Sequence, residues 1–360
     1  MAVSEHGATR LLTAGPVWGR VLLLDPPDDA AVDAVRAAAG SELLALDART
    51  FDVRRTSFAT LWTGSASEDT AGSFDLALMY LPKGKARQHW LLDQAQRALG
   101  PAGELRVVGG KREGIRSIRE AVNARFTEPL GVSSGGHAQC VAARRPRAPE
   151  ATQTHGVDVY ARAVTVDVPG GPLRCVWYPG VYGAEKLDEG TALLLQAIAP
   201  AIDAGALDDA KRVLDVGCGS GVLGAALARA AGARGLLQRG LRVELVDVDA
   251  LAVEAARATL AGLGLPDGSA VTYGSDVYGA TAGRYDWILS NPPFHDGVGT
   301  SYDVADRLIR EAPARLERGG RLTLVANAFL PYRDALDQAF GAHRVLAETG
   351  RFRVYEATRS

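Results

Sequence analysis

An asparagine, two prolines and a phenylalanine follow one apolar segment in an order that suits the binding of an amino group. They are Asn291, Pro292, Pro293 and Phe294, directly after the predicted strand 286–290. Proline has no N–H group and a fixed φ, so this loop presents carbonyl oxygens and an amide side chain rather than backbone donors. The Asn291 oxygen and the Pro292 carbonyl could accept both hydrogens of a planar amino group and direct its lone pair at an electrophile. Phe294 could stack on the attached ring; a plain Asn-Pro turn is the alternative.

A second candidate is a glycine-rich loop between an apolar strand and a helix. The run Asp215-Val-Gly217-Cys-Gly219-Ser-Gly221 overlaps the end of the predicted strand 212–216 and precedes a helix that begins near Val222. Glycine allows a tight turn and a close approach of a ligand, and a helix N-terminus offers unpaired N–H groups. The end of this loop also matches the dinucleotide pattern G-x-G-x-x-G. The acid before the loop and the first glycine at position 217 argue against that assignment.

Two acidic residues stand at the ends of the next two predicted strands. Asp247 closes the strand 242–248, where a carboxylate could accept hydrogen bonds from the two hydroxyls of a ribose. Asp276 follows the strand 270–274, at a place suited to hold an adenine amino group. A solvated strand-end acid is the alternative for Asp247, and a helix N-cap is the alternative for Asp276.

These residues resemble the class I S-adenosylmethionine-dependent methyltransferases, and in particular the branch with N-P-P-[YF] that methylates amino groups. A closer resemblance is to the RsmC-type ribosomal RNA guanine-N2 methyltransferases. The segments that carry it are Pro179–Tyr182, Leu187–Leu195, Ser290–Gly297, Thr300-Ser301, Asn327–Tyr332 and Thr349–Tyr355. Tyr80–Lys85 and Val107–Ser117 resemble the non-catalytic first domain of that family. The resemblance covers most of the chain.

The resemblance implies a site for S-adenosylmethionine and an adjacent site for a guanine. It assigns to the cofactor Thr191, Asp215, Gly217, Gly219, Gly221, Asp247, Asp276 and Asn291, with the glycines at the methionine part, Asp247 at the ribose and Asp276 at the adenine. It assigns Asn291, Pro292 and Phe294 to the catalytic hold on the guanine, with Pro293 and His295 beside them. The implied reaction is an in-line methyl transfer to the exocyclic N2 of a guanine in 16S ribosomal RNA, without a metal or a covalent intermediate. The base must be unpaired or flipped out.

Other acceptors and one other class of protein stay open from the sequence. A guanine of 23S ribosomal RNA, a DNA adenine and a protein glutamine could each take the methyl group. The last two usually accompany Asn-Pro-Pro-Tyr, whereas this chain has Phe294. A ribosome assembly factor that binds RNA through a vestigial methyltransferase half is the alternative that is not an enzyme.

Alternating short apolar runs and helix-forming segments predict a parallel-type α/β sheet in each half of the chain. In the second half the predicted strands are 212–216, 242–248, 270–274, 286–290 and 321–326, with a helix over 250–263. Residues 157–178 alternate around a Pro-Gly-Gly-Pro turn and predict a β-hairpin ahead of this sheet. The polar, proline-containing stretch 144–155 is interpreted as a linker between the halves.

The two halves show a faint internal repeat. Val21–Asp25 parallels Val213–Gly217, and Leu43–Asp47 parallels Val243–Asp247. Phe74-Asp75 parallels Tyr285-Asp286, and the turn before the following strand begins with Gly103 in one half and Gly320 in the other. With the resemblance, this predicts two tandem Rossmann-like class I methyltransferase domains, the N-terminal one degenerate, with the hairpin leading into the catalytic domain. The predicted boundaries are 1–145, 146–178 for linker and hairpin, and 179–360.

The first half lacks both chemical loops and carries cations instead. Asp25-Pro-Pro-Asp-Asp29 replaces the glycine loop, and Leu81-Pro-Lys-Gly-Lys85 replaces the Asn-Pro-Pro-Phe loop. The cations that could contact RNA phosphates are Lys83, Lys85, Arg87, Lys111, Arg112, Arg116, Arg119, Arg144, Arg145 and Arg147. A solvated helix face is the alternative for these charges.

Composition sets broader limits on the class of protein. The 360 residues hold 40 basic and 42 acidic side chains, a net charge of −2, which excludes a strongly basic coat over the whole chain. Up to residue 150 there are 19 basic and 17 acidic residues, so the first half is the more positive one. Three cysteines without a C-x-x-C pair indicate reduced thiols and no zinc site. We expect a cytoplasmic monomer that acts on ribosomal RNA or the small ribosomal subunit, with no membrane and no metal.

Overall fold

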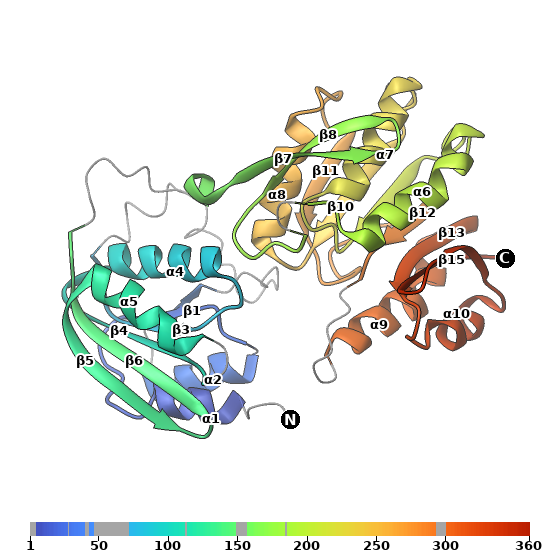
Figure 1. The fold of residues 1–360 in the computed structure, drawn as a ribbon. Coiled ribbons are helices and arrows are strands. Elements are labelled where there is room, and N and C mark those ends of the chain that lie inside the picture. Colours follow the sequence, from blue (N-terminus) through green and yellow to red (C-terminus); the bar gives the residue numbers. More distant parts are fainter. Residues whose placement is uncertain are drawn as a thin grey trace. The chain divides into compact units, whose positions relative to one another are not determined.

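Two compact units, Met1–Ala161 and Arg162–Ser360, make up the computed structural model (Figure 1). The structure describes residues 5–27, 29–39, 43–46, 72–111, 114–148, 157–183, 186–292 and 300–360. Each unit is built on one open sheet that mixes parallel and antiparallel strands.

The first unit has a six-stranded sheet in the order β2-β1-β3-β4-β6-β5. Its strands are β1 (Val21–Leu24), β2 (Leu43–Leu46), β3 (Phe74–Tyr80), β4 (Leu99–Gly110), β5 (Phe126–Gly135) and β6 (Ala138–Pro146). Its helices are α1 (Glu5–Leu12), α2 (Asp29–Ala39), α4 (Lys85–Ala98) and α5 (Ile115–Arg125), followed by a short 3-10 helix over Val157–Tyr160. The strands β1 to β4 are parallel, whereas β6 and β5 are antiparallel additions.

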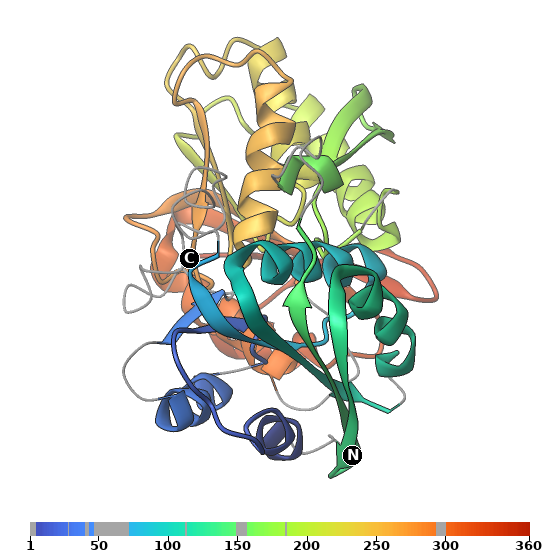
Figure 2. The same cartoon turned by 90° about the vertical axis from the view of Figure 1, so that its left-hand side faces the viewer.

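Helices cover both faces of this first sheet (Figure 2). One face packs Leu23 and Leu78 against Leu12 of α1 and Val32 and Val35 of α2. All four residues of β1 are buried, as expected for a parallel strand covered on both sides. The core of this unit therefore lies on both sides of the central strands β1 and β3.

The second unit has a seven-stranded sheet in the order β11-β10-β9-β12-β13-β15-β14. Its strands are β9 (Arg212–Val216), β10 (Arg242–Asp247), β11 (Ala270–Gly274), β12 (Tyr285–Ser290), β13 (Leu316–Asn327), β14 (Arg344–Glu348) and β15 (Phe352–Thr358). Its helices are α6 (Glu189–Asp203), α7 (Val222–Ala233), α8 (Ala250–Ala261), α9 (Thr300–Arg315) and α10 (Tyr332–Phe340). One core cluster joins the strand residues Leu214, Ile288 and Leu324 to Ile309 of α9 and Leu336 of α10.

The predicted hairpin is present and is anchored to two helices of the second unit. Its strands are β7 (Arg162–Val168) and β8 (Gly171–Trp177). The Val176 N–H donates to Thr259 Oγ1 of α8 at 2.9 Å. The Arg229 guanidinium of α7 donates to the carbonyl oxygens of Pro169, Gly171 and Pro172 at the hairpin turn. These contacts hold the hairpin against the second unit.

Two predictions about the path of the chain need correction. The sheets are not parallel throughout, because β13 pairs antiparallel with β15 and β4 with β6. The predicted linker starts too early: Arg144, Arg145 and Pro146 belong to β6, where Arg144 pairs with Glu104 of β4. Residues 149–156 lie outside the described residues.

Candidate active site

A cavity of about 340 Å³ opens at the carboxyl ends of β9, β10, β11 and β12. The strands β9, β10, β11 and β12 are parallel, so their carboxyl ends share one edge of the sheet. In open α/β sheets this edge is where ligands bind. The beginning of α6 and the turn before it close the cavity from the other side. Its size is within the usual range for small-molecule sites.

The glycine loop after β9 lies in the wall of this cavity. Gly217 and Gly219 have φ values of 71° and 54°, in the left-handed region that other residues adopt at a cost. The Gly217 and Cys218 N–H groups donate to the Val246 carbonyl at 2.8 and 3.0 Å, which fixes the loop to β10. A side chain at Gly221 would place its Cβ 2.9 Å from Ala256, so a small residue is needed for α7 to pack on α8.

The Asp215 carboxylate connects the end of β9 to the start of α7. Only 1% of Asp215 is exposed, and its Oδ2 accepts a hydrogen bond from the Gly224 N–H at 2.9 Å. Burial raises the pKa of Asp215 to about 7. The sequence predicted a contact with the cofactor; the structure places Asp215 in the cavity wall, where it holds the glycine loop in shape.

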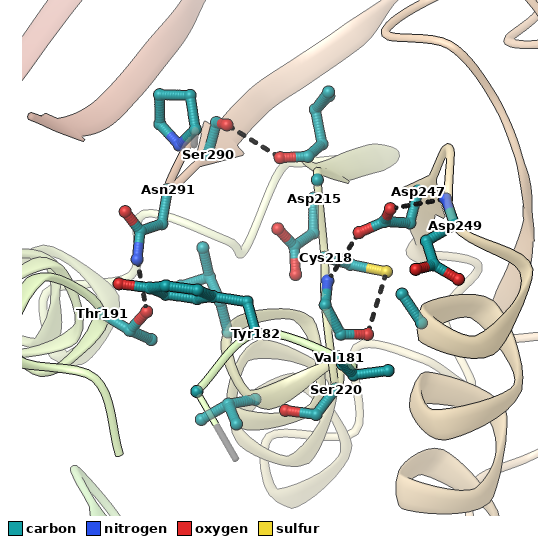
Figure 3. Close-up of a pocket in the computed structure, with 18 of the residues that line it drawn as sticks. Val181, Tyr182, Thr191, Asp215, Cys218, Ser220, Asp247, Asp249, Ser290 and Asn291 are labelled. Atoms are coloured by element: carbon teal, nitrogen blue, oxygen red, sulfur yellow. Dashed lines mark hydrogen bonds between the residues drawn. The ribbon is translucent and has the colours of Figure 1, made fainter. Parts of the chain in front are cut away.

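Asp247 lies next to the loop at the end of β10 (Figure 3). Its Oδ2 accepts the Gly219 N–H at 2.9 Å, and its Oδ1 accepts the Asp249 N–H at 2.9 Å. Each carboxylate oxygen has a second lone pair, so the group can still accept from two ligand hydroxyls. Burial raises the pKa of Asp247 to about 6.

Asp276 lines the cavity beyond β11, but its side chain is 61% exposed and forms an ion pair with Arg307 of α9. No helix begins at this position, so the N-cap alternative is wrong. Its backbone carbonyl instead accepts the Gly279 N–H at 3.0 Å in a turn. A ligand at Asp276 would share the carboxylate with Arg307.

The Asn291 side chain at the end of β12 has its two ends in different environments. Its Nδ2 donates to Asp188 Oδ2 at 2.9 Å and to Thr191 Oγ1 at 2.8 Å. Its Oδ1 is buried and has no hydrogen-bond partner within the described part of the chain. A reversed amide would place its oxygen against the Asp188 carboxylate, so these contacts fix its orientation. Asn291 Oδ1 is therefore a buried acceptor beside the cavity that a ligand N–H or O–H group could use (Figure 3).

Asp188 organises this corner, and the sequence analysis missed it. It caps α6 by accepting the Thr191 N–H at 2.9 Å, and its Oδ1 accepts the Tyr182 hydroxyl at 2.9 Å. Burial, with the hydrogen bond to Asp188, raises the pKa of Tyr182 to about 12. An aspartate directly before a helix, with the acidic Glu189 in the first turn, is a capping signal visible in the sequence. Its contact with Asn291 spans 103 residues and is a tertiary feature.

Pro292 is buried and lines the same cavity. Ser290 anchors the start of this loop, because its hydroxyl donates to the Val216 carbonyl of β9 at 2.8 Å. Pro293, Phe294 and His295 lie outside the described residues. The structure thus brings Thr191, the glycine loop, Asp247, Asp276 and Asn291 around one cavity.

The basic residues of the first unit divide into exposed and paired groups. Lys83, Lys85, Lys111, Arg116 and Arg119 are exposed, and Arg112 lies outside the described residues. Arg87 is buried and pairs with Asp25 at 2.6 Å, so it does not present its charge to RNA. Arg144 and Arg145 pair with Glu104 and Glu128.

The described residues lack both a cluster of metal ligands and an apolar helix long enough to span a membrane. No group of three or more His, Cys, Asp or Glu side chains among them is arranged to hold a metal ion. None of the described helices is long and apolar enough to cross a membrane.

Comparison with known proteins identifies the class that the fold and the cavity define. Residues 173–356 match the family model "Methyltransferase small domain", and residues 18–157 match "Methyltransferase small domain N-terminal". The chain therefore consists of two methyltransferase-type α/β domains, as predicted.

Two curated relatives narrow the family further. The chain is 38% identical over 295 residues to ribosomal RNA small subunit methyltransferase C of Erwinia tasmaniensis, which covers 82% of this chain and 79% of that protein. It is 41% identical over 284 residues to the protein of the same name from Chromohalobacter salexigens, and the match covers 79% of this chain and 78% of that protein. The chain belongs to the ribosomal RNA small subunit methyltransferase C family.

A solved structure agrees with this assignment. It is the T. thermophilus 16S rRNA N2 methyltransferase (RsmC) in complex with AdoMet and guanosine. The TM-score is 0.81 at 27% sequence identity, and the match covers 98% of this chain and 92% of that chain. The predicted family and fold class are confirmed.

Proposed function

We propose that this protein transfers a methyl group from S-adenosylmethionine to the exocyclic N2 of a guanine in 16S ribosomal RNA. The observation that carries the proposal is the buried Asn291 Oδ1, an acceptor without a partner among the described residues, beside a glycine loop. The names of the relatives support the RNA substrate, and the T. thermophilus structure holds AdoMet and guanosine.

The residues of the cavity fit the cofactor. Gly217 and Gly219 place no side chain in the cavity wall, where the methionine part would lie, and glycine tolerates their left-handed φ values. Asp247 retains free lone pairs for two ribose hydroxyls, and Asp276 stands at the end of β11 for the adenine. Asp215 supports the loop, and Thr191 shapes the opposite wall. When bound, S-adenosylmethionine supplies an electrophilic methyl group on a sulfonium centre.

The residues of the chain then prepare the guanine nitrogen. The N2 lone pair of guanine is delocalised into the ring, so the amino group is planar and a weak nucleophile. Asn291 Oδ1 and the Pro292 carbonyl accept its two N–H hydrogens, favour pyramidal geometry and aim the lone pair at the methyl carbon. Asp188 and Thr191 hold the Asn291 amide so that its oxygen faces the guanine. Phe294, Pro293 and His295 complete the proposed base-binding loop.

The first unit contributes binding rather than chemistry in this proposal. Its exposed cations Lys83, Lys85, Lys111 and Arg116 would contact RNA phosphates, together with Arg112. The domain boundaries proposed are 1–145, 146–178 and 179–360. We infer that the protein acts as a monomer in the cytoplasm, where its substrate is made; analytical ultracentrifugation tests the oligomeric state.

Nucleotide mapping tests the function. The full chain is incubated with labelled cofactor and, separately, with small subunits, large subunits, naked 16S and 23S RNA, DNA and protein. N2-methylguanine at one position of 16S RNA is the expected product, and Asn291→Ala should form it about 100- to 1000-fold more slowly. Label only in 23S RNA, DNA or protein would contradict the proposal. The comparison of naked RNA with the assembled subunit identifies the form of the substrate.

A further inference from the structure

The turn that follows β13 presents a phenylalanine to solvent. Phe329 is 72% exposed, more than any other exposed large hydrophobic side chain in the described ranges. Its neighbours are hydrogen-bonded: the Ala328 N–H donates to the Arg351 carbonyl at 2.8 Å, and the Leu330 N–H donates to the Asn327 carbonyl at 3.0 Å. Leu330 also packs against the core cluster of the second unit. The aromatic ring is therefore held out by an ordered turn.

This turn lies at the same edge of the sheet as the cavity. The strands β12 and β13 are parallel neighbours, so Asn327 at the end of β13 lies on the side where Asn291 follows β12. Arg351, which binds the turn through its carbonyl, forms an ion pair with Glu189 at 2.7 Å. Glu189 is the first residue of α6 and directly follows Asp188. A chain of contacts thus connects Phe329 to the corner that orients Asn291.

We call the surface formed by Phe329, Arg351 and Arg353 the rim. Its side chains suit the binding of a nucleic acid base more than the binding of a free anion. The Arg351 guanidinium lies over the Phe352 ring at 5.2 Å, and the Arg351 carbonyl binds the turn that carries Phe329. Its pair with Glu189 is 72% and 64% exposed, and an exposed pair of this kind is weak and can exchange partners. Arg353 nearby is paired with Glu348, so the rim has little excess charge. Exposed aromatic rings and guanidinium planes bind unpaired bases by stacking, which does not depend on base identity.

We propose that Phe329 stacks on the base of a nucleotide that flanks the target guanine, while Arg351 exchanges Glu189 for the phosphate between them. The inference rests on the proposed function, since it requires RNA at the cavity. It explains why a rigid turn exposes an aromatic ring at this edge. It also gives the protein a hold on a flipped-out segment beyond the single guanine that enters the cavity.

The test separates binding of an RNA segment from binding of a single nucleoside. The full-length variants Phe329→Ala and Phe329→Trp are compared with the wild-type chain. The ligands are a short single-stranded RNA that contains the target guanine and, separately, guanosine. We expect Phe329→Ala to raise the KM for the RNA about tenfold, as for loss of one stacked base. Guanosine binding and cofactor binding should stay unchanged. Phe329→Trp should restore the KM and change its fluorescence when RNA binds.

Val271→Ala on the edge strand β11 is the matched control, because Val271 is also an exposed apolar residue. Arg351→Gln should reduce the salt dependence of RNA binding by about one phosphate contact. A Phe329→Ala variant with wild-type KM for RNA, or with equal losses for RNA and guanosine, would overturn the inference. So would a change in oligomeric state, which would make the rim a protein interface. If the wild-type chain methylates no RNA, the proposed function fails instead, and the fluorescence of Phe329→Trp still reports whether RNA contacts the rim.

Discussion

Asp75 in the first unit and Asp286 in the second lie near the amino ends of β3 and β12, where the two sheets are built alike. Asp75 Oδ2 accepts the Arg20 N–H at 2.8 Å, and Asp286 Oδ2 accepts the Arg212 N–H at 2.9 Å. Arg20 lies over the aromatic ring of the first residue of β3, and Arg212 does the same at β12. Both strands also shift register against the next strand at the same point.

The carboxyl edges of the two sheets differ at the positions that these registers align. Asp25 stands where the second unit has Gly217, and both have a left-handed backbone, with φ values of 52° and 71°. Tyr80 stands where the second unit has Asn291. The Tyr80 hydroxyl bonds to Thr9 at 2.6 Å, and Asp25 pairs with Arg87.

This difference separates contacts that stabilise the fold from a polar group that is available to a ligand. The contacts at the amino edge hold strands together and are present in both units. At the carboxyl edge the first unit bonds Tyr80 to Thr9 and Asp25 to Arg87, whereas in the second unit Asn291 Oδ1 has no partner among the described residues. The first unit shares the architecture of the second but has internal bonds at the positions that line the cavity in the second.

Breaking the Asp25–Arg87 ion pair of the first unit should have the largest effect on stability. Asp25→Gly removes the partner of a buried arginine, at a cost of about 3 kcal/mol, and relieves about 1 kcal/mol of left-handed strain. The free energy of unfolding in urea should therefore fall by about 2 kcal/mol. Asp33→Ala, which breaks the exposed pair with Arg36, is the control and should cost less than about 0.5 kcal/mol. Equal losses in both variants would show that the Asp25 pair does not stabilise the unit.

The second-largest effect is expected from removing the Asp188 carboxylate, which orients Asn291, because kcat should then fall. Asp188→Ala frees the amide to rotate and should lower kcat about 10- to 100-fold in single-turnover transfer, because the acceptor is no longer preorganised. Asp188→Asn keeps an acceptor oxygen and a good N-cap, so kcat should stay within about threefold. Loss of the helix cap alone would appear in unfolding experiments. Equal kcat values for the two variants would contradict the orienting role.

Acid should weaken cofactor binding through Asp247. Its folded-state pKa of about 6 is above the ordinary 3.8, so the folded apo chain favours the protonated form and loses this stabilisation as the pH rises through 6. Ribose hydroxyls donate to the ionised form, so cofactor affinity should fall below pH 6 by up to about tenfold per pH unit. Calorimetry from pH 5 to 8 measures this. Asp247→Asn should bind more weakly and lack the step; a step that persists would exclude Asp247 as its origin.

Tyr182, which reaches Asn291 through Asp188, should have the smallest effect on kcat. Tyr182→Phe removes the hydrogen bond to Asp188 Oδ1, while Oδ2 still accepts from Asn291. We expect kcat to change by less than about twofold, as for one partly exposed hydrogen bond. A tenfold loss would mean that Tyr182 contacts the substrate directly.

The sequence predicted the strands of the second sheet well because buried parallel strands are continuous apolar runs between turn residues. The strands at 212–216 and 270–274 have the predicted bounds. The strand that contains Arg144 was missed because its arginines and proline resemble a linker, and only pairing with β4 makes it a strand. Local patterns do not reveal such pairing.

The site was predictable where its residues lie in local motifs and not where the contacts are distant in sequence. The glycine loop, Asp247 and Asn291 each follow a strand, so topology alone brings them together. Asp188 lies 103 residues from Asn291, and Arg87 lies 62 residues from Asp25. Neither pairing leaves a periodic signal, so an orienting carboxylate was missed and a buried arginine was grouped with exposed cations.

In the proposed mechanism, Asn291 Oδ1 binds the guanine amino group and is not required for the structure of the cofactor site. The most direct measurement compares Asn291→Ala with the wild-type chain in single-turnover methyl transfer and in calorimetric binding of S-adenosylmethionine. We predict a rate lower by about 100- to 1000-fold, the usual cost of losing a preorganised transition-state contact. The cofactor Kd should stay within about threefold, because Asp247 and the glycine loop remain intact. A transfer rate near that of the wild type would contradict the account.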